Sequence, residues 1–338
     1  MHRCRARSLA VCGCIRAVRA IVLGFGLLLP MAGAWAGDEV VRVASFNIRN
    51  YLCMDRRLEG TFRPGYPKPE AEKAAVRAVI REVDADVVCL QEIGPQPFLD
   101  ELQHDLEREG TSYPHAVLLD GADPLRHIAV LSRLPFAAVV SHSDIDFDYL
   151  DRREVLKRGM LEVQFGSDDA AWRVFVLHLK SPLTEDRADP QAEERRVREA
   201  RAARDRILER TRGEPGARYL IVGDLNAAPD ARALRGLLRR GTIEVARLVP
   251  TADSRGETWT HLQARSERYE RVDYLLPSPA LVPAIRSGRA HVHDGPDALV
   301  GSDHRLLWIE IAVAGEAGAP TDKTKTPAGA GPAGVSAR

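Results

Sequence analysis

The sequence predicts an α/β fold, because two strand–helix pairs open the chain and strands dominate its second half. Residues 40–46 are rich in β-branched side chains and partly alternate in polarity, which is typical of a strand that ends at Asn47. Residues 69–83 place apolar side chains at the spacing of one helix face. Residues 86–92 form a short apolar run that predicts a second strand, and residues 97–109 repeat the helical spacing. This βαβα order indicates layered sheets and helices.

The second half of the chain is predicted to be mostly strand. Between two of its strands, residues 189–210 predict a helix in which opposite charges recur at i, i+4 spacing. These charges fit a solvated helix face better than a nucleic-acid-binding patch, and both interpretations stay open. The further strand candidates are residues 127–132, 155–165, 172–179, 219–223, 272–276 and 305–313.

Residues 1–36 have the pattern of a secretory signal peptide that is cleaved near Ala36. An arginine-rich start precedes the apolar run 21–29, and small residues precede Gly37. The alternative is an uncleaved membrane anchor, but the apolar run is short for a bilayer span and Pro30 follows it. We therefore expect a secreted or periplasmic protein whose mature chain has no transmembrane segment.

The mature chain is expected to be one enzyme-sized domain with a tail. Its 338-residue precursor is 45% apolar, which suffices for a sizeable core over residues 37–314. Residues 315–338 are rich in Ala, Gly, Pro and Thr without an apolar period, so we expect a disordered tail. Cys53 and Cys89 would remain after cleavage and could pair in an oxidising compartment. The oligomeric state is not predicted.

The charge balance argues slightly against tight DNA binding. Loss of residues 1–36 removes five arginines and no acid, which leaves 43 Lys and Arg against 48 Asp and Glu, a net charge of −5. A mildly acidic chain lacks the overall field of a strong nonspecific DNA binder, although a local basic patch remains compatible with it.

Polar and acidic side chains recur where the predicted strands end. Loops converge at strand ends in layered α/β proteins, so such residues can line one ligand site. Each alone also fits a simpler role, since Asp and Asn after a strand often form turns. Carboxylate and amide oxygens suit Mg²⁺, with Mn²⁺ or Ca²⁺ as alternatives, and the short His or Cys spacings of zinc sites are missing. The residues are Asn47, Glu92, His178, Asp224, Asn226, Asp273, Asp303 and His304.

Six short segments that contain these residues resemble the motifs of the endonuclease/exonuclease/phosphatase family. They occur in the family's order and lie within residues 40–313. The resemblance implies a four-layer α/β sandwich like that of deoxyribonuclease I, with two face-to-face, mainly antiparallel sheets flanked by helices. The segments are residues 44–48, 86–92, 178–181, 223–226, 271–274 and 302–304.

The resemblance also implies roles for the residues. Three would serve at the metal, namely Asn47, Glu92 and Asp303. The catalytic group would comprise His304 at the phosphate, Asp273 to orient that histidine, Asp224 and Asn226 to orient or activate water, and His178 to donate to a phosphoryl oxygen. Lys180 and Arg271 are candidate substrate-binding cations, and an ordinary solvated lysine is an equal alternative for Lys180.

The function that follows is an exported, divalent-metal-dependent phosphoesterase that hydrolyses phosphodiester bonds and is most like a nuclease. A phosphomonoesterase or a sphingomyelinase-like lipid phosphodiesterase is the alternative, and a non-catalytic binding module on the same fold is a third. Residues 49–69 and 257–269 hold cations and rings that could contact a phosphate ester substrate such as a nucleic acid, or could pack the loops. The sequence shows no clear apolar hairpin for a lipid surface, which favours soluble substrates.

Overall fold

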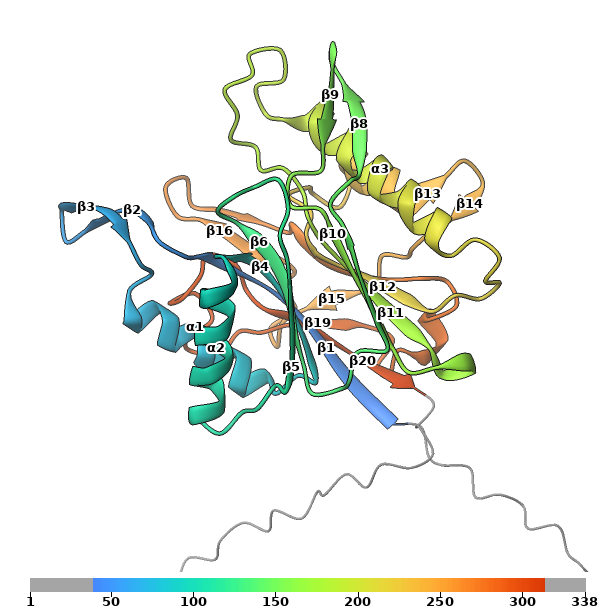
Figure 1. The fold of residues 1–338 in the computed structure, drawn as a ribbon, viewed down its shortest axis with the longest axis horizontal. Helices are drawn as coiled ribbons and strands as arrows, with labels where there is room; N and C mark the ends of the chain where they lie inside the picture. The colour runs from blue at the N-terminus through green and yellow to red at the C-terminus, as the bar shows by residue number, and fades with distance from the viewer. Residues whose placement is uncertain (1–38, 314–338) are drawn as a thin grey trace, which may run out of the picture. The chain divides into compact units, whose positions relative to one another are not determined.

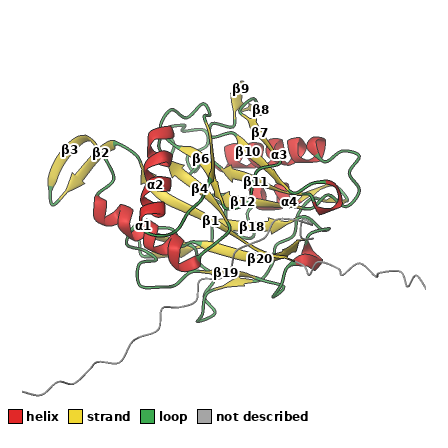
Figure 2. Ribbon diagram, turned by 60° about the horizontal axis from the view of Figure 1, so that its bottom comes forward, coloured by secondary structure: helices red, strands yellow, loops and turns green. Residues whose placement is uncertain are grey.

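The computed structural model describes residues 39–313, in which two large β-sheets stack with helices on both outer sides (Figures 1 and 2). The predicted signal peptide and the predicted tail lie outside these residues and stay predictions. Among residues 39–313, no helix has the length and apolar character needed to cross a membrane.

The first sheet has seven strands in the order β15-β19-β20-β1-β4-β6-β5. Its central pair, β1 (Glu39–Tyr51) and β4 (Val87–Ile93), is parallel, as the intervening helix α1 (Glu70–Val83) requires. The outer strands are β20 (Leu307–Val313), β19 (Ala290–Val292), β15 (Thr251–Ala252), β6 (His127–Ser132) and β5 (His115–Leu119).

The second sheet has five strands in the order β18-β12-β11-β10-β7. It repeats the parallel centre, because β11 (Trp172–His178) and β12 (Tyr219–Asp224) are connected through helix α3 (Glu193–Arg210). The other strands pair antiparallel and are β18 (Asp273–Pro277), β10 (Met160–Phe165) and β7 (Ala138–His142).

Three apolar clusters bind the layers together. Val43 and Val130 of the first sheet meet Val163 and Val174 of the second in the core between the sheets. On the outer face of the first sheet, α1 and α2 (Gln96–Arg108) bury their apolar sides, and α3 and α4 (Arg232–Leu238) do so on the second. Burial of each large apolar side chain contributes roughly 1.5–3 kcal/mol, so these clusters dominate the stability of the fold. The predicted four-layer sandwich is confirmed.

Short hairpins extend from the sandwich at its loops. The pair β2 (Met54–Leu58) and β3 (Thr61–Tyr66) projects beyond α1 and α2 (Figure 1). The remaining hairpins are β8 (Asp146–Tyr149) with β9 (Arg152–Val155), β13 (Arg239–Arg240) with β14 (Ile243–Glu244), and β16 (His261–Gln263) with β17 (Arg268–Glu270). Two single 3₁₀ turns cover Asp168–Ala170 and Val282–Ala284.

Two predicted boundaries were wrong. The strand expected over residues 155–165 is two strands, because β9 ends at Val155 and β10 begins at Met160, with Gly159 at a φ of 65° in the turn between them. The first strand does not end at Asn47 but continues, with a shift of register, to Tyr51.

The two cysteines are not bonded to each other. Cys53 is exposed, whereas Cys89 lies in the core between the sheets, where burial raises the pKa of its thiol. A buried, protonated thiol is unreactive, so Cys89 serves as a small core residue.

Candidate active site

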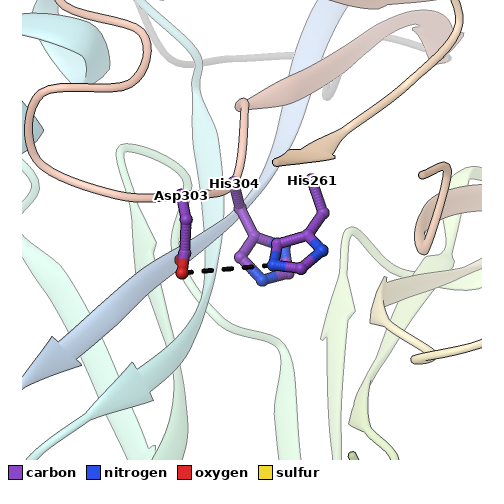
Figure 3. Close-up of side chains that lie close together, drawn as sticks. All are labelled: His261, Asp303 and His304. Atoms are coloured by element: carbon purple, nitrogen blue, oxygen red, sulfur yellow. Dashed lines mark ion pairs between the residues drawn. The ribbon is translucent and has the colours of Figure 1, made fainter. Parts of the chain in front are cut away.

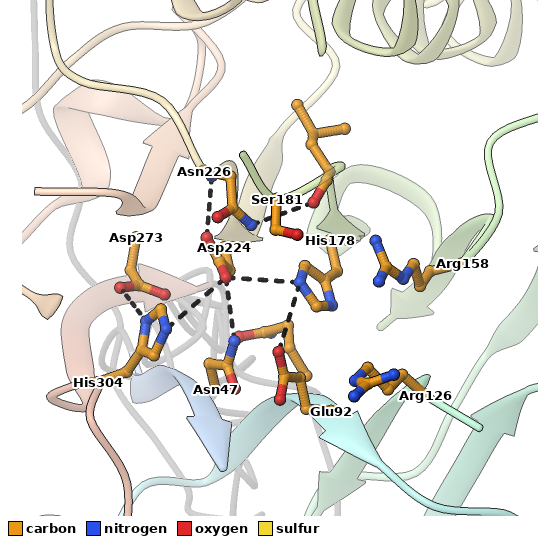
Figure 4. A network of polar contacts seen from close by, with 12 residues as sticks. Asn47, Glu92, Arg126, Arg158, His178, Ser181, Asp224, Asn226, Asp273 and His304 are labelled. Atoms are coloured by element: carbon orange, nitrogen blue, oxygen red, sulfur yellow. Dashed lines mark hydrogen bonds and ion pairs between the residues drawn. The ribbon is translucent and has the colours of Figure 1, made fainter. Parts of the chain in front are cut away.

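The two parallel strand pairs bring polar residues of both sheets to one edge of the sandwich (Figure 4). In the first sheet, Asn47 of β1 and Glu92 of β4 lie near the downstream ends of paired strands. In the second, His178 of β11 pairs with Asp224 of β12. The Asn47 Nδ2 donates a hydrogen bond of 3.0 Å to Asp224 Oδ2, which joins the sheets across the site.

The backbone at this edge adopts left-handed conformations that turn the polar side chains into the site. Arg49, Asn50, Glu92 and Asn226 have φ values of 43°, 51°, 63° and 48°. Each such residue costs of order 1 kcal/mol or more, so local bonds must hold it. Asn50 N–H donates to Glu92 Oε2 at 2.9 Å, and Asn226 N–H donates to Asp224 Oδ1 at 2.9 Å.

His304 and Asp273 form a buried pair beside this cluster. The His304 Nδ1 lies 2.9 Å from Asp273 Oδ2, and Thr260 Oγ1 accepts the Asp273 N–H at 3.1 Å. Burial alone would lower the pKa of His304, but the charge and hydrogen bond of Asp273, helped by Asp224, outweigh it and raise that pKa to about 10. At neutral pH His304 is therefore an imidazolium with Nε2–H directed toward Asp224, 3.9 Å away.

Asp224 is the carboxylate on which the cluster converges. It is 1% exposed, and burial together with the charge of Asp273 raises its pKa to about 7, although His304 and the Asn226 N–H oppose the shift. Its Oδ2 lies 3.0 Å from Asn47 Nδ2 and 3.5 Å from His178 Nε2. A carboxylate with such a pKa can take up a proton near neutral pH.

His178 is a neutral imidazole at neutral pH. Burial, and then the positive charges of Arg158, His304, Arg126 and Lys180, hold its pKa well below the usual value. Its Nε2 lies 3.5 Å from Asp224 Oδ2 and 3.9 Å from Glu92 Oε1, which favours the tautomer with the proton on Nε2. Its Nδ1 has no hydrogen-bond partner among the described residues.

The carboxylates of the site, and not the protonated His304, are the groups that fit a divalent cation. Two groups of side chains place ligand atoms within 4.8 Å of one another: Asp224, Asp273 and His304, and His261, Asp303 and His304 (Figure 3). Asp273 Oδ1 is buried without a partner in the described part of the chain, and Glu92 keeps 18% of its side chain exposed. Several carboxylates so close together are costly unless a cation offsets their charge.

Asp303 lies at the rim, where it already has a cationic partner. Its Oδ2 is 3.2 Å from Arg49 Nε and 4.0 Å from His261 Nε2. The His261 ring lies 4.5 Å from the His304 ring, centroid to centroid. The sequence singled out His261 only as part of the segment 257–269, whose cations and rings either contact substrate or pack the loop, because no motif marks it.

Two arginines that the sequence did not single out border the site. Arg126 donates from Nε to Asn50 Oδ1 at 2.8 Å, and Arg158 donates from Nε to Asp123 Oδ2 at 3.0 Å. Figure 4 shows both guanidinium groups beside Glu92 and His178. They come from loops remote in sequence from every motif, so only the fold reveals them.

The two cations predicted to bind substrate are engaged elsewhere. Lys180 Nζ donates to the carbonyl of Ser181 at 3.1 Å and also to that of Leu183. Arg271 Nη2 donates to Thr251 Oγ1 at 2.8 Å, and its guanidinium lies 5.0 Å from the Tyr274 ring centroid. The structure brings the other eight predicted residues to one edge, whereas the substrate contacts of Lys180 and Arg271 stay predictions.

The chain is similar in fold to several solved structures. Sphingomyelinase C from Streptomyces griseocarneus superimposes with a TM-score of 0.55 at 16% identity over 81% of this chain and 99% of that chain. The human Nocturnin catalytic domain, with a bound sulfate, gives 0.54 at 16% identity over 82% and 96%. A beta toxin mutant from Staphylococcus aureus with bound magnesium ions gives 0.54 at 14% identity over 80% and 99%. At these identities the likeness shows the fold alone.

The family is shown by the sequence. No curated protein sequence matches the chain. The profile of the Endonuclease/Exonuclease/phosphatase family, however, matches residues 44–304, which is most of the chain and runs from β1 to His304. This chain therefore belongs to the endonuclease/exonuclease/phosphatase family.

Proposed function

We propose that this member of a phosphoric ester hydrolase family is a divalent-metal-dependent phosphodiesterase that uses water as its nucleophile. The observation that carries the proposal is the buried cluster in which a proton acceptor and a proton donor lie side by side. Asp224 Oδ2 is 3.9 Å from Nε2 of His304, which Asp273 keeps protonated. Hydrolysis of a phosphodiester needs both, because water must lose a proton while the leaving oxygen and the phosphoryl group gain negative charge.

Each side chain has a task that its surroundings support. Asp224 takes the proton from the attacking water, and Asn47 fixes the position of Asp224 through the bond of 3.0 Å. His304 directs its Nε2–H at the phosphate. The Nε2–H of neutral His178 serves as a further donor. A bound divalent ion, with Mg²⁺ the first candidate, would supply Lewis-acid stabilisation of the phosphoryl charge, and Glu92, Asn47 and Asp303 would hold it.

A nucleic acid is the substrate class that we favour. The projecting β2–β3 hairpin carries Arg57 and Arg63, and its Phe62 and Tyr66 are 57% and 39% exposed. Cations beside exposed rings suit phosphates and bases. A lipid phosphodiesterase is the second candidate, supported by the fold similarity to a sphingomyelinase and by exposed Phe62 on a hairpin. The hairpin also carries five charged residues, which suits a membrane surface less well: Asp55, Arg56, Arg57, Glu59 and Arg63.

We also propose that the enzyme is exported after cleavage near Ala36. The support is the N-terminal sequence alone, with its arginine-rich start, apolar run and small residues before Gly37. Expression of the full chain in a bacterial host, followed by fractionation and N-terminal sequencing, tests this. A full-length cytoplasmic product would refute it.

One activity panel tests the reaction and its substrate. The protein from Gly37 onward is incubated with plasmid DNA, bis(p-nitrophenyl) phosphate, p-nitrophenyl phosphate and sphingomyelin, each with Mg²⁺, Mn²⁺, Ca²⁺ or chelator. We expect metal-dependent diester cleavage and a loss of at least about a hundredfold in His304→Ala. The matched control is His291→Ala, because His291 stacks on Trp308 outside the cluster.

The panel separates the alternatives. Faster cleavage of the monoester would make the chain a phosphomonoesterase, and preference for sphingomyelin would make it a lipid phosphodiesterase. A folded protein without activity under any metal would support the non-catalytic binding module.

A further inference from the structure

The outer helical layer over the second sheet contains a groove whose side chains are all cationic. Its volume is about 460 Å³, and glycine is the only other residue type that lines it. The groove lies where α3, α4 and the β13–β14 hairpin meet (Figure 1). The cations are Arg201, Arg204, Arg232, Arg235, Arg239 and Arg240.

Arg204 forms the fixed floor of this groove. It is 9% exposed, and its Nη1 donates to the carbonyls of Gly236 and Arg239 at 2.8 and 3.1 Å. Asp205 accepts from its Nε at 2.9 Å. These bonds tie α3 to the end of α4 and to β13. The arginines above are therefore presented by a rigid surface.

The groove has more positive charge than its surroundings neutralise. Asp205 is also 3.6 Å from Arg240, and Arg232 is 3.4 Å from Glu194. Among residues 39–313, no carboxylate lies within ion-pair distance of Arg201, Arg235 or Arg239. The whole chain has 48 basic and 48 acidic residues, so this excess is local and does not follow from the composition.

The arrangement suits a row of phosphates better than a single anion. One phosphate can be satisfied by two bidentate guanidinium groups, whereas the five arginines above Arg204, spread over three elements, can contact several phosphates. The absence of any aromatic lining residue predicts contacts to the backbone of a nucleic acid without base stacking.

We propose that this arginine groove is a second nucleic-acid-binding site, separate from the catalytic edge, that holds the phosphate backbone without regard to sequence. None of its lining residues belongs to the active-site cluster. The proposal goes beyond the phosphodiesterase function and can hold whether or not that function does. In a nuclease the groove would retain the substrate between cleavages.

Binding is measured by fluorescence anisotropy with a labelled single-stranded oligonucleotide of about 20 residues, in chelator and in the His304→Ala background, so that no turnover is needed. The test variant is Arg201→Gln with Arg235→Gln, because both side chains are exposed and Arg204 is left intact. The control is Arg108→Gln with Arg286→Gln, which removes the same charge from exposed positions outside the groove.

The expected result follows from counterion release. Each phosphate contact changes the slope of log K against log salt by roughly 0.7–0.9, which at about 50 mM salt corresponds to roughly tenfold in affinity. The test variant should therefore bind about 10- to 100-fold more weakly and lose roughly 1–2 units of slope. The control should retain the affinity and slope of the parent.

Three outcomes would overturn the proposal. The first is equal binding by the test and control variants. The second is parent binding that does not depend on salt. The third is preferential, groove-dependent binding to vesicles of phosphatidylglycerol over the oligonucleotide, which would assign the groove to a membrane surface. Circular dichroism and thermal unfolding of both variants exclude misfolding as the cause of a loss.

Discussion

Replacement of Asp273 by Asn should make hydrolysis fail at alkaline pH more than at neutral pH. The carboxylate lies 2.9 Å from His304 Nδ1 and is the main cause that raises the pKa of this histidine to about 10 against the effect of burial. An amide keeps the shape but not the charge. An opposite charge at this distance shifts a pKa by roughly 1–3 units, so we expect His304 to titrate about 2 units lower, equivalent to about 3 kcal/mol.

The loss should depend on pH in a way that a purely structural defect would not. With a pKa near 10, His304 is mostly protonated at pH 9, whereas about a tenth remains protonated with a pKa near 8. The smaller protonated fraction of His304 alone then lowers kcat/KM about tenfold at pH 9 and only a little at pH 6.5. The assay is a pH profile of kcat/KM for bis(p-nitrophenyl) phosphate, with NMR titration of the His304 ring.

Unfolding provides a second readout of the same shift. The folded chain binds a proton at His304 that the unfolded chain loses near pH 6.5, so this stabilisation is full below that pH and is lost as pH rises toward 10. The metal-free parent should therefore lose stability over this range more steeply than Asp273→Asn. The control is Asp86→Asn. Asp86 directly precedes β4, and its carboxylate accepts a hydrogen bond from the Arg42 N–H of β1. An alkaline limb that is the same in Asp273→Asn and the parent would refute the reasoning.

Three further substitutions probe the metal, the backbone and a buried ion pair. Glu92→Gln should reduce the rise in Tm that Mg²⁺ produces in chelator-treated protein, and it should lower the rate of hydrolysis by about a hundredfold or more. An unchanged rise in Tm would show that Glu92 does not bind the metal. Gly223→Ala should lower the free energy of unfolding in urea by roughly 2–4 kcal/mol. Gly223 has a φ of 133°, and a Cβ there would lie 1.9 Å from the Leu177 carbonyl oxygen. Near-normal stability of this variant would contradict the strand register. Asp253→Asn should lower the free energy of unfolding by roughly 3–5 kcal/mol, because it leaves the Arg305 guanidinium without its counterion. That guanidinium is 1% exposed and lies 2.7 Å from Asp253 Oδ2. A small loss of stability would show that water or the carbonyls around Arg305 suffice.

The sequence predicted the parts of the fold that have strong apolar periods. The central strands and α1, α2 and α3 are long and bury one side or both, so the strands appear as apolar runs and the helices as apolar side chains at helical spacing. The hairpins β2–β3 and β16–β17 are short, polar and mostly exposed, and therefore carry no such pattern. The error over residues 155–165 has another origin, because apolar residues flank the turn on both sides: Val155 and Leu156 precede it, and Met160 follows Gly159 directly.

The candidate site was predictable where a strand end fixes a residue's position. Asn47, Glu92, His178 and Asp224 lie at or near the ends of strands that are parallel in pairs, and parallel neighbours direct their carboxyl ends to the same edge. Loops provide no comparable rule. Arg126 and Arg158 became visible only when the chain was folded, and the local carbonyl contacts of Lys180 could not be deduced from its place beside His178.

Asn47 explains why the two halves of the site depend on each other. Its side chain donates to Asp224 at 3.0 Å, and its carbonyl accepts from Ser302 Oγ at 2.7 Å. The same Ser302 Oγ accepts the His304 N–H at 3.0 Å. One residue of β1 therefore positions both the proton acceptor and the imidazolium, while its strand pairs with β4, which carries Glu92. Because the packed sheets hold β1 in place, the distances among acceptor, donor and metal-side carboxylate are set by the core and not by the loops.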